Sequence, residues 1–163
     1  MHTVIMIHEW WGLNNSMATT AELLAQQNLQ KIRVFVPNLY RDQPAIDSED
    51  AGHKMTNLDW PQAIKDIQTI KEHFDKTSES VSVMGFCMGG ALTFASASAI
   101  SGWKAAFPFY GIPDLNVFRL DQITCKVLAQ FGSLDPLKGF SDAESATKLA
   151  EDAKKNNYPI DVK

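Results

Sequence analysis

One stretch of the chain runs Val81-Ser82-Val83-Met84-Gly85-Phe86-Cys87-Met88-Gly89-Gly90, and it specifies the architecture. Its first half is apolar and rich in valine, which predicts a buried strand. Small residues follow from Gly89 onward and predict a helix that ends before Gly102. A cysteine between such a strand and such a helix, with a glycine two positions away on each side, has the pattern of a nucleophile elbow with cysteine in place of serine.

The glycines of this pattern have a steric reason. The turn from strand to helix is so tight that a larger side chain at Gly85 or Gly89 would strike neighbouring backbone. Cys87 would then be held exposed at the sheet edge, at a helix N-terminus that favours the reactive thiolate. The alternative is a small buried cysteine beside a pair of packing glycines. The strand–turn–helix context favours the nucleophile.

On either side of the elbow, apolar strands alternate with amphipathic helices. Alternation of this kind predicts an α/β protein, with a doubly wound, mostly parallel sheet and helices on both faces. Ser16 and Ser141 are the expected N-caps of the first and last helices. The strands are expected at 4–7, 32–36, 81–86, 105–110, 127–132 and from 160, and the helices at 17–30, from Asp59-Trp60-Pro61 to 74, from 89, and at 141–156.

Composition narrows the classes of function. The chain has 163 residues, a formal net charge of -4 and no repeat or linker, so we expect a single domain over residues 1–163. The acidic balance argues against nucleic acid as a partner. No apolar run approaches the ~20 residues that span a bilayer, and the start has no signal-peptide pattern. Two cysteines make no disulfide framework, so we expect a reducing, cytoplasmic location.

Polar residues follow other predicted strands, where parallel sheets place their ligands. Asp135, in Gly132-Ser133-Leu134-Asp135-Pro136, comes after the nucleophile, as the triad acid of this fold does. An ordinary Asp-Pro turn would explain it equally well. Asp114, in Ile112-Pro113-Asp114, is a weaker rival at an earlier strand end.

A third signal, His8-Glu9-Trp10-Trp11-Gly12, follows the first predicted strand. The loop at this place supplies one backbone N–H of the oxyanion hole, and the residue after the nucleophile supplies the other. These donors would be Trp10 and Met88. Taken alone, Glu9 is most simply a solvated carboxylate at a strand end.

Together the three signals resemble the dienelactone hydrolase family of the α/β-hydrolase superfamily, and Val36-Pro37-Asn38-Leu39-Tyr40 adds to the resemblance. The resemblance implies a Cys-Asp-His triad in which Cys87 is the nucleophile and Asp135 the acid. It implies that Glu9 partners the cysteine and helps to form the thiolate. It also implies hydrolysis of a small-molecule lactone or ester through a thioester, with no metal or organic cofactor.

The sequence departs from the family pattern at the histidine. The family's histidine follows the strand that begins here near Ile160, whereas all four histidines precede Cys87. We expect His8 to be structural and His53 and His73 to be surface helix residues. The family usually also has strands before Val4. We therefore expect an α/β-hydrolase fold that is incomplete at its N- and C-termini.

Two further questions remain open at this level. Arg41 follows the Leu39-Tyr40 segment and could bind a substrate carboxylate, although an exposed loop arginine is the commoner reading. The leading function is an ester or lactone hydrolase with a cysteine nucleophile. The alternative is a catalytically impaired member of the fold that acts as a structural or interaction subunit. A serine-type esterase relative with broad ester preference is a third possibility.

Overall fold

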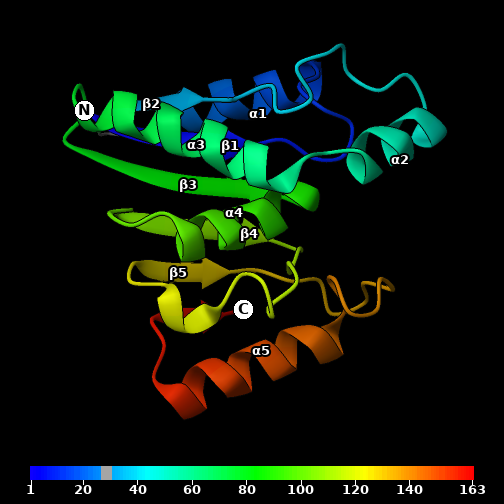
Figure 1. The fold of residues 1–163 in the computed structure, drawn as a ribbon, viewed down its shortest axis with the longest axis vertical. Coiled ribbons are helices and arrows are strands. Elements are labelled where there is room, and N and C mark those ends of the chain that lie inside the picture. Colours follow the sequence, from blue (N-terminus) through cyan, green and yellow to red (C-terminus); the bar gives the residue numbers. More distant parts are fainter. Residues whose placement is uncertain (27–30) are drawn as a thin grey trace.

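The sheet confirms the predicted architecture. A computed structural model describes residues 1–26 and 31–163 (Figure 1). Its six-stranded sheet has the order β2-β1-β3-β4-β5-β6, and every paired strand runs parallel to its neighbour. The strands are β1 His2–Ile7, β2 Ile32–Phe35, β3 Ser80–Phe86, β4 Ala105–Phe109, β5 Lys126–Ala129 and β6 Ile160–Val162.

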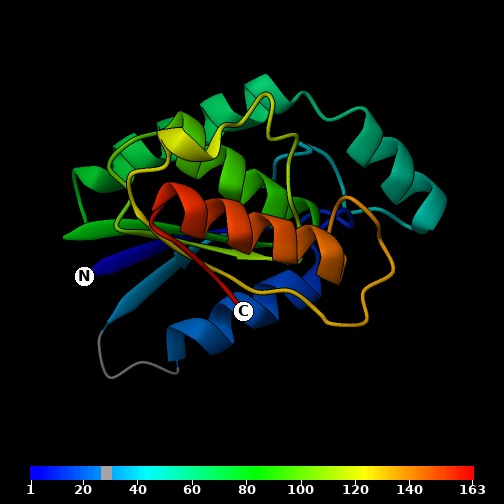
Figure 2. The same cartoon turned by 90° about the horizontal axis from the view of Figure 1, so that it is seen from below.

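Helices cover both faces of this sheet, as a doubly wound fold requires. Figure 2 shows α1 on one face and α3, α4 and α5 on the other. The helices are α1 Asn15–Gln26, α2 Ser48–Thr56, α3 Trp60–Asp75, α4 Met88–Ala99 and α5 Ala143–Asn156, with a short 3-10 helix, η1, at Leu120–Gln122.

The core lies where β1, β3 and α4 meet. Ile5, Met6 and Ile7 of β1 are fully buried, which confirms the expectation of a first strand buried on both faces. Ala91 and Ala95 of α4 are also fully buried. Such small residues let the helix that follows Cys87 lie close against the sheet.

Helix starts were predicted correctly in one case and wrongly in two. Asp59 caps α3 by accepting a hydrogen bond from the Gln62 N–H at 3.0 Å, as its Asp-Trp-Pro start predicts. For α1 the cap is Asn14, which accepts from the Met17 N–H at 3.0 Å, and for α5 it is Asp142, so the expected caps Ser16 and Ser141 are wrong. Asn14 lies two positions before Ser16, and Asp142 lies one position after Ser141. The expected end of the first helix, near Gln30, falls outside the described residues.

One helix, α2, was not predicted. Asp47 caps it by accepting from the Asp50 N–H at 2.9 Å, and of its residues only Ala51 is buried. A helix with one buried residue has almost no apolar periodicity to detect. The segment 38–47 precedes it, and together they form one rim of the carboxyl end of the sheet (Figure 1).

A proline lies inside strand β4, where its missing N–H would ordinarily disfavour it. Pro108 belongs to β4, and its carbonyl accepts a hydrogen bond of 3.0 Å from the Gln130 N–H. The ladder to β5 pairs Ala106 with Val127 and resumes only at the Phe109–Gln130 bridge. The N–H that proline lacks falls in this gap, so its absence costs the sheet little.

Candidate active site

Cys87 stands at the turn between β3 and α4 in a strained backbone conformation. Its φ is 55° and its ψ is −118°, a region that residues with a side chain rarely occupy. A Cβ added to Gly85 would overlap the carbonyl oxygen of Gly89, and one added to Gly89 would overlap that of Ile7. The steric reason given for both glycines is therefore confirmed.

Two more glycines hold the turn, and sequence reasoning gave neither a place in it. A Cβ on Gly90 would overlap the carbonyl oxygen of Phe109, and one on Gly111 would overlap that of Cys87 itself. The Cys87 N–H donates to the Phe109 carbonyl at 3.0 Å. The elbow therefore packs directly against backbone at the ends of β1 and β4. A side chain added at one of these glycines would overlap that backbone.

The Cys87 thiol is half-buried, and its surroundings favour the protonated form. Burial raises the pKa of the Cys87 thiol above its ordinary value, the Met88 N–H opposes this, and the charges of Glu9 and Asp135 raise the pKa further. The expectation that the helix terminus favours the thiolate is therefore incomplete. The N–H of the first turn acts in that direction, but burial outweighs it.

Glu9 lies two residues beyond β1, where its charge acts on the thiol, and it is held by a residue that follows β4. The hydroxyl of Tyr110, one residue beyond that strand, donates to Oε1 of Glu9 at 2.9 Å. Burial, this bond and the charges of Glu9 and Cys87 all raise the pKa of Tyr110 well above its usual range, so the phenol stays protonated and stays a donor. Sequence reasoning assigned Tyr110 no function.

Of the two candidate triad acids, Asp135 is the one whose charge reaches the thiol. It follows β5, is half-buried, and accepts a hydrogen bond from the Leu137 N–H at 3.0 Å. Asp114 is exposed and accepts from the backbone and side chain of Asn116 in its own turn. The arrangement favours Asp135 over Asp114 as a partner of Cys87.

The two predicted oxyanion donors lie on adjoining segments. Trp10 is in the turn after β1, closed by the Gly12 N–H donating to the Glu9 carbonyl at 3.0 Å. Within residues 1–26 and 31–163 its N–H has no hydrogen-bond partner. The Met88 N–H lies in the first turn of α4 and lowers the pKa of the Cys87 thiol. One side chain, Tyr40, touches both residues: its hydroxyl donates to the Trp10 carbonyl at 2.8 Å and lies 3.5 Å from Sδ of Met88.

His8 is structural, as expected, and cannot serve as a base. The ring is fully buried, and the Leu39 N–H donates to its Nε2 at 3.2 Å. Nδ1 then carries the proton and donates to the Glu9 carbonyl at 2.7 Å. Burial lowers the pKa of His8, so the neutral ring persists. His53, on α2, and His73, on α3, are exposed helix residues, again as expected.

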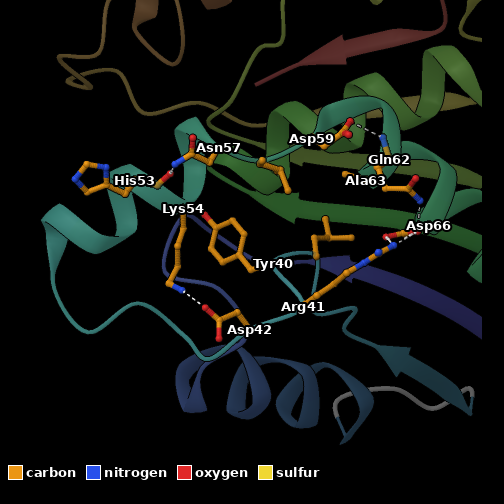
Figure 3. Close-up of a pocket in the computed structure, with 12 residues that line it drawn as sticks. Tyr40, Arg41, Asp42, His53, Lys54, Asn57, Asp59, Gln62, Ala63 and Asp66 are labelled. Carbon is orange, nitrogen blue, oxygen red and sulfur yellow. Dashed lines mark hydrogen bonds and ion pairs between the residues drawn. The ribbon is translucent and has the colours of Figure 1, made fainter.

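A pocket of about 490 Å³ lies on the outer side of Tyr40, and Arg41 and Lys54 line it (Figure 3). Both cations are paired. Arg41 binds Asp66 through one guanidinium nitrogen at 2.7 and 2.6 Å, and Lys54 binds Asp42 at 2.7 Å. The side chain of Arg41 is 63% exposed, so this ion pair is weak. Arg41 as a substrate contact stays a prediction.

The described residues, 1–26 and 31–163, hold no group of three or more His, Cys, Asp or Glu side chains placed to bind a metal ion. Nor does any helix within these ranges have the length and apolar character needed to cross a membrane.

The comparison with known proteins identifies one family. The family model described as "Dienelactone hydrolase family" matches residues 1–163. "Protein usf" of Aquifex pyrophilus is 28% identical over 168 residues, covering 98% of this chain and 71% of that protein. A protein of Aquifex aeolicus named "Putative carboxymethylenebutenolidase" is 27% identical with the same coverage.

Among solved structures, one titled "Putative Dienelactone Hydrolase", from Klebsiella pneumoniae, superposes with a TM-score of 0.82 at 18% identity. It covers 99% of this chain and 72% of that one. The structure of esterase PE8 superposes with a TM-score of 0.73 at 10% identity, covering 98% and 80%. Identities this low establish the fold alone, which is that of an α/β-hydrolase.

Proposed function

Because the chain belongs to the dienelactone hydrolase family, we propose that it cleaves a small-molecule carboxylic ester or lactone with Cys87 as the nucleophile. One observation carries the proposal: the Cys87 thiol stands on a strained elbow within reach of the charges of Glu9 and Asp135. Strain of this kind persists only where the surrounding structure imposes it, and it gathers at functional sites.

The first step is acylation. The pKa of the Cys87 thiol is raised, so the proton has to be removed before the sulfur can attack, and we assign that task to the carboxylate of Glu9. The sulfur bonds to the carbonyl carbon, the C–O bond to the leaving group breaks, and the alcohol departs with the proton. The N–H groups of Trp10 and Met88 would stabilise the oxyanion between these events.

The second step is hydrolysis of the thioester, which needs an activated water. In a triad the base is a histidine oriented by an acid, here Asp135. The histidines of this sequence are His2, His8, His53 and His73, and both ring nitrogens of His8 are already bonded. We therefore propose that these 163 residues acylate faster than they deacylate.

Arg41 is proposed to bind a carboxylate on the substrate. Its guanidinium already holds one carboxylate, that of Asp66, and the exposed pair is easily exchanged. The pocket shares Tyr40 with the elbow. A reducing compartment is also proposed, since Cys87 and Cys125 are both free thiols.

Incubation with p-nitrophenyl acetate tests the proposal. We expect a burst of one p-nitrophenol per chain followed by slow turnover, and an acetyl group on Cys87 in the intact mass after acid quenching. Cys87→Ala should abolish the burst. Cys125→Ala is the matched control and should keep it, because Cys125 is buried and its pKa is raised by that burial.

Three results would count against this scheme. An acetyl group on another residue would exclude Cys87 as the nucleophile. Rapid turnover that depends on Cys87 would show that these residues do contain a base. A Cys87 that is neither acylated nor alkylated would favour a structural or interaction subunit instead.

A further inference from the structure

One phenol joins the two backbone segments proposed to bind the oxyanion. The Tyr40 hydroxyl donates to the Trp10 carbonyl at 2.8 Å and approaches Sδ of Met88 at 3.5 Å. It has a single proton, and a carbonyl is a better acceptor than a thioether, so the bond to Trp10 dominates. The sulfur contact places the same hydroxyl against the residue that follows Cys87.

The rest of its segment holds the same loop. The Leu39 N–H donates to His8 at 3.2 Å, and the Ala45 N–H donates to the Trp11 carbonyl at 2.9 Å. The Tyr40 ring lies 5.0 Å from the His8 ring, and a Cβ on Gly12 would come within 3.0 Å of the Tyr40 ring. The turn after β1 is therefore anchored on both sides of Trp10, and Tyr40 anchors Trp10 itself.

This anchoring matters because the N–H groups of an oxyanion hole are most effective when they are already oriented before the reaction begins. The Trp10 N–H belongs to the same planar peptide unit as the Glu9 carbonyl, which accepts from Nδ1 of His8 at 2.7 Å and from the Gly12 N–H at 3.0 Å. The next peptide unit carries the Trp10 carbonyl, and among residues 1–26 and 31–163 the hydrogen bond that holds it is the one from Tyr40. Donors displaced by a fraction of an ångström lose much of their effect on the transition state.

We propose that Tyr40 is a positioning residue for the oxyanion hole, holding Trp10 against Met88 so that both N–H groups converge on the substrate carbonyl oxygen. The inference rests on the proposed function, since it presumes acylation of Cys87. Tyr40 itself touches neither the thiol nor, on this scheme, the reacting atoms.

The donor is present over the whole working range of pH. Burial, with smaller contributions from the charges of Cys87 and Asp50, raises the pKa of Tyr40 to about 12. The ring of Tyr40 also walls the pocket of Figure 3, between the ion pairs Lys54–Asp42 and Arg41–Asp66. A substrate group bound in that pocket would therefore contact Tyr40, the residue proposed to position the oxyanion hole.

The test is Tyr40→Phe, which removes the hydroxyl and keeps the ring contacts. Two reactions of the same thiol are compared: the acylation burst with p-nitrophenyl acetate, and alkylation by iodoacetamide followed by mass spectrometry. Acylation builds an oxyanion, whereas displacement at a saturated carbon builds none. We expect the burst rate to fall about tenfold, the effect of losing one well-placed hydrogen bond, and the alkylation rate to stay within about twofold.

Tyr158→Phe is the matched control, in the turn between α5 and β6, and both rates should be unchanged. An unchanged burst in Tyr40→Phe, or an equal fall in both rates, overturns the inference while the wild-type burst upholds the proposed function. A wild-type chain that shows no burst overturns both. If Tyr40→Phe does not fold, Tyr40→Met takes its place, because its flexible side chain fills space and carries no hydroxyl. A selective fall in its burst rate supports the inference, and an unchanged burst overturns it.

Discussion

The hydroxyl of Tyr110 donates a hydrogen bond of 2.9 Å to the carboxylate of Glu9, joining the ends of β4 and β1. These strands lie on either side of β3, which carries Cys87. The bond therefore passes over the carboxyl end of the nucleophile strand. It holds the Glu9 carboxylate where its charge acts on the thiol.

Replacing Glu9 by Gln should change two reactions of Cys87 in opposite directions. The charge of Glu9 raises the pKa of the thiol, so its removal lowers that pKa, and the pH profile of iodoacetamide alkylation should shift to lower pH. The acylation burst should instead slow by about 100-fold, because the base is lost. Stopped-flow absorbance measures the acylation burst, and mass spectrometry measures the alkylation.

Tyr110→Phe provides the control for that pair. It keeps the charge of Glu9 and removes only the hydrogen bond that holds the carboxylate, so the alkylation profile should shift less than it does in Glu9→Gln. An alkylation profile that moves to higher pH in Glu9→Gln would contradict the assigned electrostatics. A burst rate equal to wild type would remove Glu9 as the base.

Asp66→Asn should free Arg41 and improve the use of esters that bear a carboxylate. The pair is exposed, so we expect the burst rate with p-nitrophenyl monosuccinate to rise by about two- to fivefold over that with p-nitrophenyl acetate. Adding Arg41→Gln should cancel the gain. An equal rise with both esters would show that Arg41 does not bind the carboxylate.

Two Gly→Ala substitutions should have opposite effects on stability. A Cβ on Gly111 would overlap the carbonyl oxygen of Cys87, and backbone cannot give way cheaply, so Gly111→Ala should cost about 3 kcal/mol or prevent folding. Gly52 is in helix α2 with no atom within 4 Å of an added Cβ, so Gly52→Ala should gain about 0.5–1 kcal/mol. Urea unfolding measures both, and a Gly111→Ala as stable as wild type would refute the enclosed elbow.

Buried His8 should make stability fall below about pH 6.5, its ordinary pKa in an unfolded chain. Burial lowers the pKa of His8 in the fold, so above that pH both states are neutral and the stability is fully present. As the pH falls, the unfolded chain binds this proton at a higher pH than the folded chain does. Proton binding then lowers the free energy of the unfolded state and reduces the stability of the fold. Unfolding free energies between pH 7 and pH 5 measure the loss.

His2 needs a control here, since burial lowers its pKa as well. The slope should therefore be compared between His2→Gln and the double variant His2→Gln with His8→Asn. The free energy of unfolding of the double variant should change less with pH over this range. Equal slopes would exclude His8 as the source.

The features that sequence could predict are those fixed locally. The elbow needs a strand, glycines beside Cys87 and a helix, and all of these lie within residues 81–90. The parallel sheet follows from alternation of strands and helices, and the carboxyl ends of such strands share one edge. Glu9 and Asp135 could be assigned to that edge for this reason.

The features that sequence could not predict depend on distant packing. Tyr40 and Tyr110 act through hydrogen bonds to Trp10 and Glu9. No local sequence pattern indicates that a tyrosine holds a residue far away in the chain. The raised pKa of the Cys87 thiol needs a knowledge of burial and of two carboxylates from other strands. The helix α2 was missed because solvent surrounds most of it.

The strand order carries a cost during synthesis. β1 (His2–Ile7) leaves the ribosome before both of its neighbours, β2 and β3, which begin at Ile32 and Ser80. Until β3 is synthesised, one edge of this mostly apolar strand has no backbone partner. Contacts between such distant segments form slowly, because the loop between them has to close first. The nascent chain is therefore most exposed to aggregation between the synthesis of β1 and that of the cysteine elbow, and a chaperone that binds apolar segments would act in this interval.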